Sequence, residues 1–217
     1  MAYTTIKKSS DYFNTKLYTG NGADGNAVTN VGHSPDFVWI KQRNSMSHRL
    51  YDKIRGVNSA LISNETNAED QYSAYGQFES FDSDGFTVGA GTSNGHGTNE
   101  NGQSIASWNW LANGAGSANT DGSISSTVSA NTTSGFSIVS YTGTGANATV
   151  GHGLGVAPKI VLVKSRNQAY QWLFQTTQID GSYDYLYLNQ TDAKADLSVS
   201  APTNTVFNLS NSDVFNG

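Results

Sequence analysis

The chain has 217 residues, of which 13% are charged and 36% are hydrophobic, and its formal net charge is −5. Soluble proteins have about 25% charged residues, and no basic cluster here exceeds Lys7-Lys8, so no nucleic-acid partner is expected. The chain has no cysteine, which excludes disulfides, thiolate zinc sites and thiol catalysis.

The composition favours short strands joined by turns. There are 23 glycines, only 3 prolines and 11% aromatic residues, alongside many Asn, Ser and Thr. Gly and Asn supply the positive φ angles that tight turns require, and aromatic residues favour strands. No apolar run reaches the ~20 residues of a membrane span, and the first eight residues lack the apolar core of a signal peptide.

The first predicted strands lie in the N-terminal half. Residues 13–18 are rich in strand-forming residues and end in a Thr-Gly-x-Gly turn. Residues 37–41 form a continuous apolar run after a proline, which predicts a strand buried on both faces. Residues 49–52 follow as its partner strand across a polar turn. Residues 160–164, in the second half of the chain, form a similar apolar run after a proline and carry the same prediction of a strand buried on both faces.

A hairpin and a closing strand follow. Residues 78–81 and 86–89 flank an Asp-Ser-Asp-Gly turn, which indicates a β-hairpin. Residues 105–111 alternate aromatic and polar side chains and close this half of the chain. Residues 112–122 are small and polar, which predicts a flexible connection. No stretch keeps a helical apolar period over three turns.

The two halves of the chain match each other. Residues 13–44 align with residues 136–167 at a constant offset of 123 without a gap, and residues 61–68 align with 186–193 after a two-residue slip. Coincidence is a poor explanation for a match of this length, so we interpret it as a tandem repeat. The identical residues include Tyr18-Thr19-Gly20 and Tyr141-Thr142-Gly143, Pro35 and Pro158, Lys41 and Lys164, and Arg43-Asn44 and Arg166-Asn167.

The repeat predicts an all-β protein made of antiparallel β-sandwiches. We expect a first sandwich with an N-terminal arm over residues 1–115, a linker with a leading strand over 116–135, and a second sandwich over 136–217. The second copy is incomplete, since 217 − 123 = 94 residues remain against a repeat of 123, and the counterpart of residues 105–111 is missing. Either the chain is a fragment, which we favour, or a neighbouring subunit supplies the closing strand.

Two acidic residues of the hairpin turn have a spacing that could support chemistry. Glycosidases need two carboxylates about 5–9.5 Å apart, and Asp82 and Asp84 are the best-spaced pair. Turn residues that hydrogen-bond to their own backbone are the preferred interpretation. A calcium site at Asp82 and Asp84 is the alternative, with the remaining oxygen ligands coming from distant loops. The four histidines share no metal-binding spacing.

Sugar binding is the functional hypothesis that the polar loops support. Glycan sites combine aromatic faces, which pack against the C–H groups of sugar rings, with polar groups that bind hydroxyls. For each single residue, aromatic packing inside the protein or between subunits is the competing interpretation. The candidate glycan-binding residues are Tyr72, Tyr75, His96, Asn99, Tyr170, Trp172 and Tyr183.

Several motifs resemble a repeated module of phage tail-fibre-like virion proteins of marine and cyanobacterial phages, which has a concanavalin-like jelly-roll fold. The resemblance covers nearly the whole chain. It implies a component of a virus particle. The motifs are residues 18–22, 35–41, 51–52, 55–56, 84–86, 135–139 and 151–159.

The expected function is therefore that of a bacteriophage virion structural protein, in a tail fibre or its attachment region, with adhesion to host glycan. We expect no enzymatic activity and no cofactor, the calcium alternative aside. The expected partners are further copies of the chain, with a trimer as the arrangement that the resemblance implies, and other virion proteins. The chain would be made in the host cytoplasm and assembled into the virion. The alternatives are a capsid decoration or head-fibre protein and a polysaccharide depolymerase or glucanase.

Overall fold

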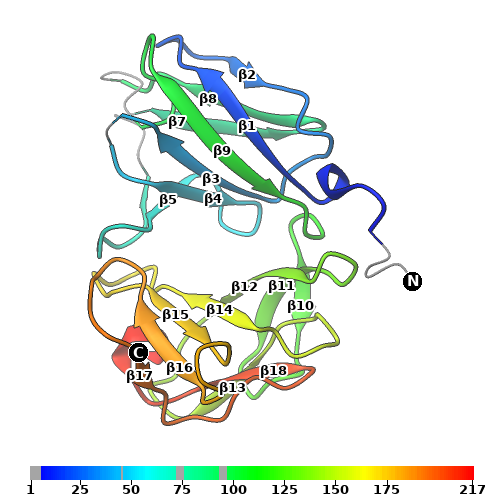
Figure 1. Cartoon of the computed structure of the whole chain (residues 1–217), viewed down its shortest axis with the longest axis vertical. Coiled ribbons are helices and arrows are strands. Elements are labelled where there is room, and N and C mark those ends of the chain that lie inside the picture. The colour runs from blue at the N-terminus through cyan, green and yellow to red at the C-terminus, as the bar shows by residue number, and fades with distance from the viewer. Residues whose placement is uncertain (1–5, 45, 72–75, 93–96) are drawn as a thin grey trace. The chain divides into compact units, whose positions relative to one another are not determined.

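The computed structural model describes the whole chain except residues 1–5, 45, 72–75 and 93–96 (Figure 1). Strands contain 42% of the residues and helices 3%, and the strands form several antiparallel sheets, which confirms the predicted all-β fold class. The chain divides into two compact units. Unit 1 comprises Met1–Ile62 and Glu69–Ala115, and unit 2 comprises Ser63–Ala68 and Gly116–Gly217. Within the described residues, no helix has the length and apolarity that a membrane crossing needs.

Unit 1 is built from two sheets, in the strand orders β1-β9-β3-β4-β5-β6 and β2-β8-β7. The predicted pairing of residues 49–52 with 37–41 and the predicted hairpin are both confirmed. A short 3-10 helix, η1 (Ser9–Asp11), precedes β1. The strands are β1 (Phe13–Thr19), β2 (Asn26–Val28), β3 (Phe37–Gln42), β4 (Arg49–Asp52), β5 (Gly56–Ile62), β6 (Asp70–Gln71), β7 (Gln77–Asp82), β8 (Gly85–Gly89) and β9 (Ser104–Trp110).

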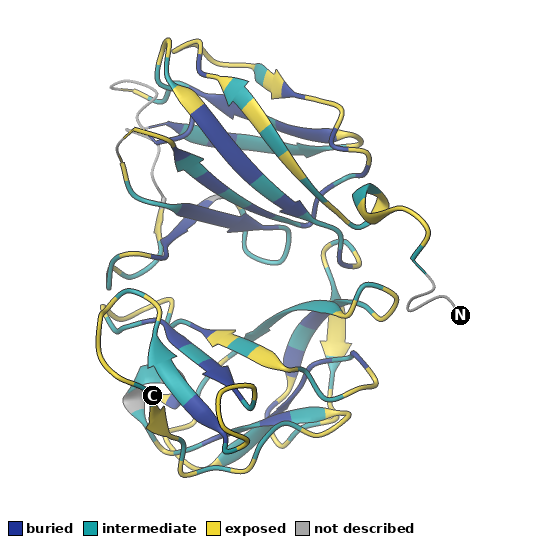
Figure 2. Ribbon diagram, viewed as in Figure 1, coloured by how far each residue is buried: buried dark blue, intermediate teal, exposed yellow. Residues whose placement is uncertain are grey.

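The core of unit 1 lies between these two sheets. Tyr51 of the larger sheet stacks on Phe78 of the smaller one, with ring centroids 4.7 Å apart, and Phe78 stacks on Phe86 at 5.5 Å. Val38 and Ile40 of β3 and Ile105 of β9 belong to the same buried cluster. Figure 2 shows β4 buried along its whole length. Burying aromatic rings of this size supplies a large share of the hydrophobic stabilisation.

The prediction that residues 37–41 and 160–164 are buried on both faces is wrong. In β3 buried residues alternate with half-buried ones, and in β14 (Ile160–Val163) Ile160 is 52% and Leu162 is 42% exposed. The reason is the layer structure: in unit 1 the smaller sheet packs on one face of the larger one, so a single face of β3 enters the core. A continuous apolar run therefore does not distinguish a two-sided strand from a one-sided strand with an apolar outer face.

The hairpin between β7 and β8 requires a glycine at its turn. Gly85 has a φ angle of +146°, and a Cβ atom at this position would lie 1.9 Å from the carbonyl oxygen of Val28. Strand β2, which carries Val28, pairs with β8, so the turn packs against its neighbour without room for a side chain. The Asp-Gly signal in the sequence thus reports a close backbone approach as well as a turn.

Buried charges connect the strands of unit 1. The Arg55 guanidinium contacts the carboxylate of Asp52 at 2.5 Å and that of Glu69 at 3.1 Å, and it donates hydrogen bonds to the carbonyl oxygens of Ser59 and Leu50. The side chains of Arg55 and Asp52 are almost completely buried. The guanidinium therefore connects the turn after β4 to β5 and to the segment before β6.

Unit 2 contains three sheets, in the strand orders β10-β11-β12, β13-β18 and β14-β15-β16-β17. A single parallel bridge between Ile124 and Val150 connects the start of this unit to β13. Its buried cluster includes Val150, Leu173 and Phe207. The elements are β10 (Ser117–Asn119), β11 (Ser126–Asn131), β12 (Phe136–Tyr141), β13 (Ala148–Gly151), β14, β15 (Leu173–Thr176), β16 (Asp184–Tyr187), β17 (Ala195–Asp196), β18 (Val206–Leu209) and the helix α1 (Asp213–Asn216).

The segment predicted as a flexible connection is partly ordered by pairing. Residues 117–119 form β10, which pairs antiparallel with β11 from Ser117↔Val128 to Asn119↔Ser126. The small polar residues of residues 112–122 give no intrinsic strand signal, and the pairing with β11 supplies the order. Residues 117–119 are therefore a paired strand inside the range predicted as a flexible connection.

The buried Arg55 network yields a stability prediction. Arg55→Ala leaves the buried Asp52 carboxylate without its counter-ion, which costs about 3–5 kcal/mol in comparable buried pairs. The measurement is urea unfolding of the intact chain followed by circular dichroism. Arg43→Ala removes an exposed arginine of the same unit and should change stability by less than about 0.5 kcal/mol. Equal changes in unfolding free energy for the two substitutions would contradict the stabilising role of the Arg55 ion pairs.

Candidate functional site

The two acidic residues of the hairpin turn bind donors of their own unit. The Asp82 carboxylate accepts hydrogen bonds from the hydroxyls of Ser80 and Thr87, each at 2.7 Å. The Asp84 carboxylate accepts from the backbone N–H groups of Asn30 at 3.2 Å and Gly32 at 2.6 Å. Asp84 thus holds the segment after β2 against the turn. Among the described residues, no group of three or more His, Cys, Asp or Glu side chains is arranged to hold a metal ion.

The candidate glycan residues of unit 1 are only partly described. Tyr72, Tyr75 and His96 lie outside the described residues. Asn99 is fully buried, and its side-chain amide forms hydrogen bonds with the loop after β1. Its oxygen accepts from the backbone N–H of Asn21 and the side chain of Asn26, while its nitrogen donates to the Asn21 side chain and the Ala23 carbonyl. These four bonds use the amide's hydrogen-bonding capacity, so its role in this structure is to order a loop.

The candidate glycan residues of unit 2 do not form an exposed set. Trp172 and Tyr183 are buried, whereas Tyr170 is partly exposed. The Tyr183 hydroxyl donates to the side-chain oxygen of the buried Gln175 at 2.6 Å. Burial raises the pKa of Tyr183, because the low-dielectric surroundings disfavour its anionic form. The positions of Trp172 and Tyr183 match the packing interpretation of these aromatic residues.

A different set of aromatic residues lies together on the outer face of the larger sheet of unit 1. Phe13, Trp110 and Phe37 are cross-strand partners on β1, β9 and β3, and the Trp110 ring lies 4.8 Å from that of Phe13 and 5.3 Å from that of Phe37. In the next row, Trp39 and Trp108 are partners, with centroids 6.3 Å apart. We call these five residues the aromatic face. Their alternation with Val38, Ile40 and Ile105 places them opposite the core.

A histidine holds one indole of the aromatic face in place. The Trp39 indole N–H donates to Nδ1 of His48 at 2.9 Å, and the two rings meet edge to face at 5.7 Å. Desolvation, and after it the charge of Lys41, lowers the pKa of His48. The imidazole therefore stays neutral at neutral pH and can accept this hydrogen bond. The result is a ring orientation that is fixed before any ligand arrives.

The aromatic face is partly open, with Phe13 36% exposed and the other four rings half-buried. Sequence reasoning assigned Phe37 and Trp39 to a fully buried strand and Trp108 and Trp110 to a closing strand, so it missed this surface. The available signal was the alternation of aromatic and polar residues in 105–111, which predicts a strand with one aromatic face. That signal does not indicate which other strands carry the matching rings.

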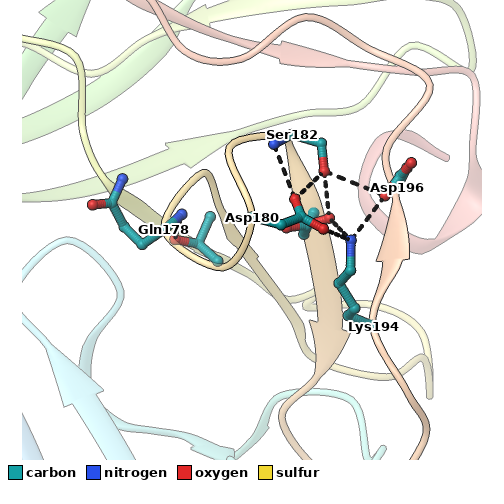
Figure 3. Close-up of polar contacts among 7 residues, drawn as sticks. Gln178, Asp180, Ser182, Lys194 and Asp196 are labelled. Atoms are coloured by element: carbon teal, nitrogen blue, oxygen red, sulfur yellow. Dashed lines mark hydrogen bonds and ion pairs between the residues drawn. The ribbon is translucent and has the colours of Figure 1, made fainter.

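A cluster of three carboxylates surrounds one lysine in unit 2 (Figure 3). Lys194 Nζ lies 2.5 Å from Asp180 Oδ2, 2.7 Å from Asp184 Oδ1 and 3.2 Å from Asp196 Oδ1. The Ser182 hydroxyl is also within hydrogen-bond distance of Asp180 and Asp184. Asp184 is fully buried, and its strand β16 pairs with β17, which carries Asp196.

Ion pairs of Lys194 hold together the segments that carry Asp180, Asp184 and Asp196. Hydrogen bonds from Lys194 and then from Ser182 lower the pKa of Asp180, and the bonds to Asp180 and Asp184 raise the pKa of Lys194. The ammonium occupies the position between the carboxylates that a cation would need. The cluster therefore joins the loop before β16 to β17 through charge pairing.

Comparison with known families gives one match. Residues 8–217 match a family described as Domain of unknown function (DUF7483). No curated protein and no solved structure matches the chain significantly.

The lysine cluster predicts a pH-dependent stability difference. Asp180, with a lowered pKa, stabilises the fold above its unfolded value near 3.8, and this contribution is lost as the pH falls below that value. Lys194, with a raised pKa, contributes below 10.5, and its contribution is lost as the pH rises above it. Lys194→Met should therefore lower the urea midpoint at pH 7, and the deficit should shrink below pH 3.8.

Lys159→Met is the matched control for the lysine cluster, because it removes an exposed lysine of the same unit. Urea midpoints of both variants and the parent protein, measured from pH 3 to pH 8 at low ionic strength, provide the comparison. A deficit of Lys194→Met that is constant across this range would show that the effect does not come from charge pairing.

Proposed function

We propose that this chain, which belongs to the DUF7483 family, is a bacteriophage virion structural protein that adheres to host-surface glycan. We place it in a tail fibre or in the attachment region of a fibre. The motif set over residues 18–22, 35–41, 84–86 and 151–159, which resembles tail-fibre-like modules, supports the virion assignment. The all-β fold and the low fraction of charged residues agree with such a role.

The aromatic face carries the proposal of glycan adhesion. A pyranose ring presents C–H groups on its faces, and these pack favourably on a flat aromatic ring. Trp39 and Trp108 provide two such rings in one cross-strand row, next to the row of Phe13, Trp110 and Phe37. Polar groups that can bind sugar hydroxyls lie among them, including Thr15, which is the β1 partner of Trp108.

Contacts within the protein already hold the side chains of the aromatic face in place, and this favours binding. The rings are held by edge contacts and by the bond from Trp39 to His48, so little side-chain entropy is lost on binding. A single shallow site of this kind binds a sugar weakly. Display of many copies on one particle multiplies the effective affinity by linking the binding events. Assembly with further copies of the chain, as a trimer, and with other virion proteins is part of the proposal.

The proposal is of a passive, non-enzymatic protein with no required cofactor. The carboxylates that sequence reasoning considered for hydrolysis, Asp82 and Asp84, bind hydroxyl and backbone donors of their own unit. Incubation of the protein with host polysaccharide tests this part through the appearance of new reducing ends. New reducing ends would show that the protein hydrolyses polysaccharide, and the depolymerase or glucanase alternative would then replace the proposal.

The position in the particle is tested by imaging. Gold-labelled antibodies against this chain, applied to purified phage particles, should decorate the tail fibres or their attachment region. Labelling of the head would instead assign the chain to capsid decoration or to a head fibre. Particles that carry no label while the protein is abundant in the infected cell would contradict the virion assignment.

Adhesion is tested by removing the flat rings while retaining apolar volume. We take each ring–sugar contact to be as strong as an aromatic pair, about 0.5–1.5 kcal/mol. The double variant Trp39→Leu and Trp108→Leu should then weaken retention in affinity electrophoresis with host surface polysaccharide about tenfold. Val156→Ala is the control, because Val156 is a 59% exposed apolar residue of unit 2, whose sheets do not include the strands of the aromatic face. Retention that survives the double variant, or that falls equally with the control, would exclude the aromatic face as the binding surface.

A further inference from the structure

The two units have sheets of the same strand order. In unit 1 the order β3-β4-β5-β6 corresponds to β14-β15-β16-β17 in unit 2. The first residues of β3 and β14 are 160 − 37 = 123 positions apart, and those of β1 and β12 are 136 − 13 = 123 positions apart. The first residues of β6 and β17 differ by 195 − 70 = 125, which reproduces the two-residue slip of the sequence match. Strand β12 therefore corresponds to β1, and β14 to β3.

The units differ at the strand that lies between these two. In unit 1, β9 pairs antiparallel with β1 from Phe13↔Trp110 to Thr19↔Ser104 and with β3 from Phe37↔Trp110 to Gln42↔Ile105. In unit 2, β12 and β14 belong to separate sheets, and each is the last strand of its sheet. Within the described part of the chain, no strand pairs with the second edge of β14 or of β12.

The side chains next to this edge are apolar and exposed. Phe37 and Trp39 of β3 contact Trp110 and Trp108 of β9. Their counterparts in β14 at the offset of 123 are Ile160 and Leu162, which are 52% and 42% exposed. An exposed apolar edge strand presents unpaired backbone groups next to apolar side chains, and this combination attracts a further strand.

The pairing of β3 with β9 in unit 1 indicates which backbone groups of β14 point toward its unpaired edge. The backbone N–H of Arg43 donates to the carbonyl of Ser104, so position 43 points toward β9. Backbone groups alternate between the two edges of a strand, and positions 41, 39 and 37 therefore point the same way. Their counterparts Lys164, Leu162 and Ile160 direct their backbone N–H and carbonyl groups toward the free edge of β14.

We propose that this edge of unit 2 is a strand-acceptor site: an extended peptide segment adds to β14, antiparallel to β14 and β12, in the position that β9 has in unit 1. The segment has the side-chain order of β9, with apolar or uncharged polar residues facing inward and two bulky apolar or aromatic residues facing outward near its end. The register of unit 1 places its counterpart of Trp110 opposite Phe136 and Ile160, and its counterpart of Trp108 opposite Ile138 and Leu162.

The donor segment is not β9 of a second copy, because β9 is paired along both edges. Recognition would come from main-chain hydrogen bonds along the strand, with specificity from alternate side chains. The inward positions of the donor would lie beside Val161 and Val163 of β14, whose counterparts in β3 are the partners of Asn109 and Ser107. This proposal is independent of the glycan and virion proposals, since it depends only on strand pairing.

The test uses the intact chain and a fluorescein-labelled peptide with the sequence of residues 103–111. We expect saturable binding in fluorescence anisotropy with a dissociation constant below about 1 mM, the weak end of specific binding. Hydrogen exchange of the complex should show new protection in residues 136–141 and 160–163. A peptide of the same composition with the alternation scrambled should not bind. Absence of saturable binding, or protection elsewhere in the chain, would overturn the proposal.

Two matched variants locate the site. Leu162→Lys places a charge on the acceptor edge, which opposes strand addition, and should weaken peptide binding tenfold or more. Leu17→Lys makes the same change at an exposed leucine of β1 in unit 1 and should leave binding unchanged. Urea midpoints confirm that both variants are folded. Peptide affinity that falls equally in both variants, or in Leu17→Lys alone, would contradict the site.

Self-association is the competing arrangement. Sedimentation velocity of the unliganded chain measures whether copies associate. Dimers that Leu162→Lys dissociates, together with a peptide that neither binds nor competes, would show that two β14 edges pair with each other. That result would overturn the proposal of a donor segment with the side-chain order of β9.

Discussion

Strand β9 is paired along both edges, to β1 and to β3, and the residue-by-residue register of these two ladders determines both faces of unit 1. Because side chains alternate along a strand, Ile105, Ser107 and Asn109 face inward and are fully buried, whereas Trp108 and Trp110 face outward. A slip of one residue would exchange the two faces. The hydrophobic core and the aromatic face are therefore consequences of the same pairing.

The polar residues of both units are largely used to hold loops and strands together. Asn99 orders the loop after β1, Arg55 connects β4 and β5, and Lys194 connects β17 to the loop before β16. Buried polar groups must be paired to offset the cost of removing them from water. Asn99 and Asp84 were candidate ligand-binding residues in the sequence, but in the structure they form hydrogen bonds with loops of their own unit. The surface of unit 1 that we propose for recognition is instead aromatic.

Among the described residues, no strand of unit 2 pairs with both β12 and β14 in the way that β9 pairs with β1 and β3. With β9 in place, the rings of β3 contact neighbouring rings, and the sheet continues without a break from β1 to β6. In unit 2 the corresponding strands β12 and β14 end two different sheets, and the apolar side chains of β14 are exposed. Exposed apolar residues at a strand edge are usually disfavoured in soluble proteins because they promote further pairing. Their presence at this edge is the basis for inferring a strand-acceptor site.

Local sequence signals were enough to predict the all-β fold class, the hairpin at Asp84-Gly85 and the pairing of β3 with β4, because turn residues and short apolar runs act over a few residues. The sequence also predicted which segments of the two halves of the chain correspond. It did not determine which face of β3 is buried, since an apolar run is compatible with one or two covered faces. The order of residues 117–119 likewise came from pairing with β11.

Which residues can form a site depends on how distant strands pair. The five rings of the aromatic face come from three strands that lie far apart in the sequence, and non-local pairing brings them together. Asn99, Trp172 and Tyr183 had the chemistry of a sugar site, but burial in the fold determines what such groups can contact. Local sequence specifies which chemical groups are present and which elements form. Their exposure and their neighbours depend on long-range strand register, which no short window of sequence contains.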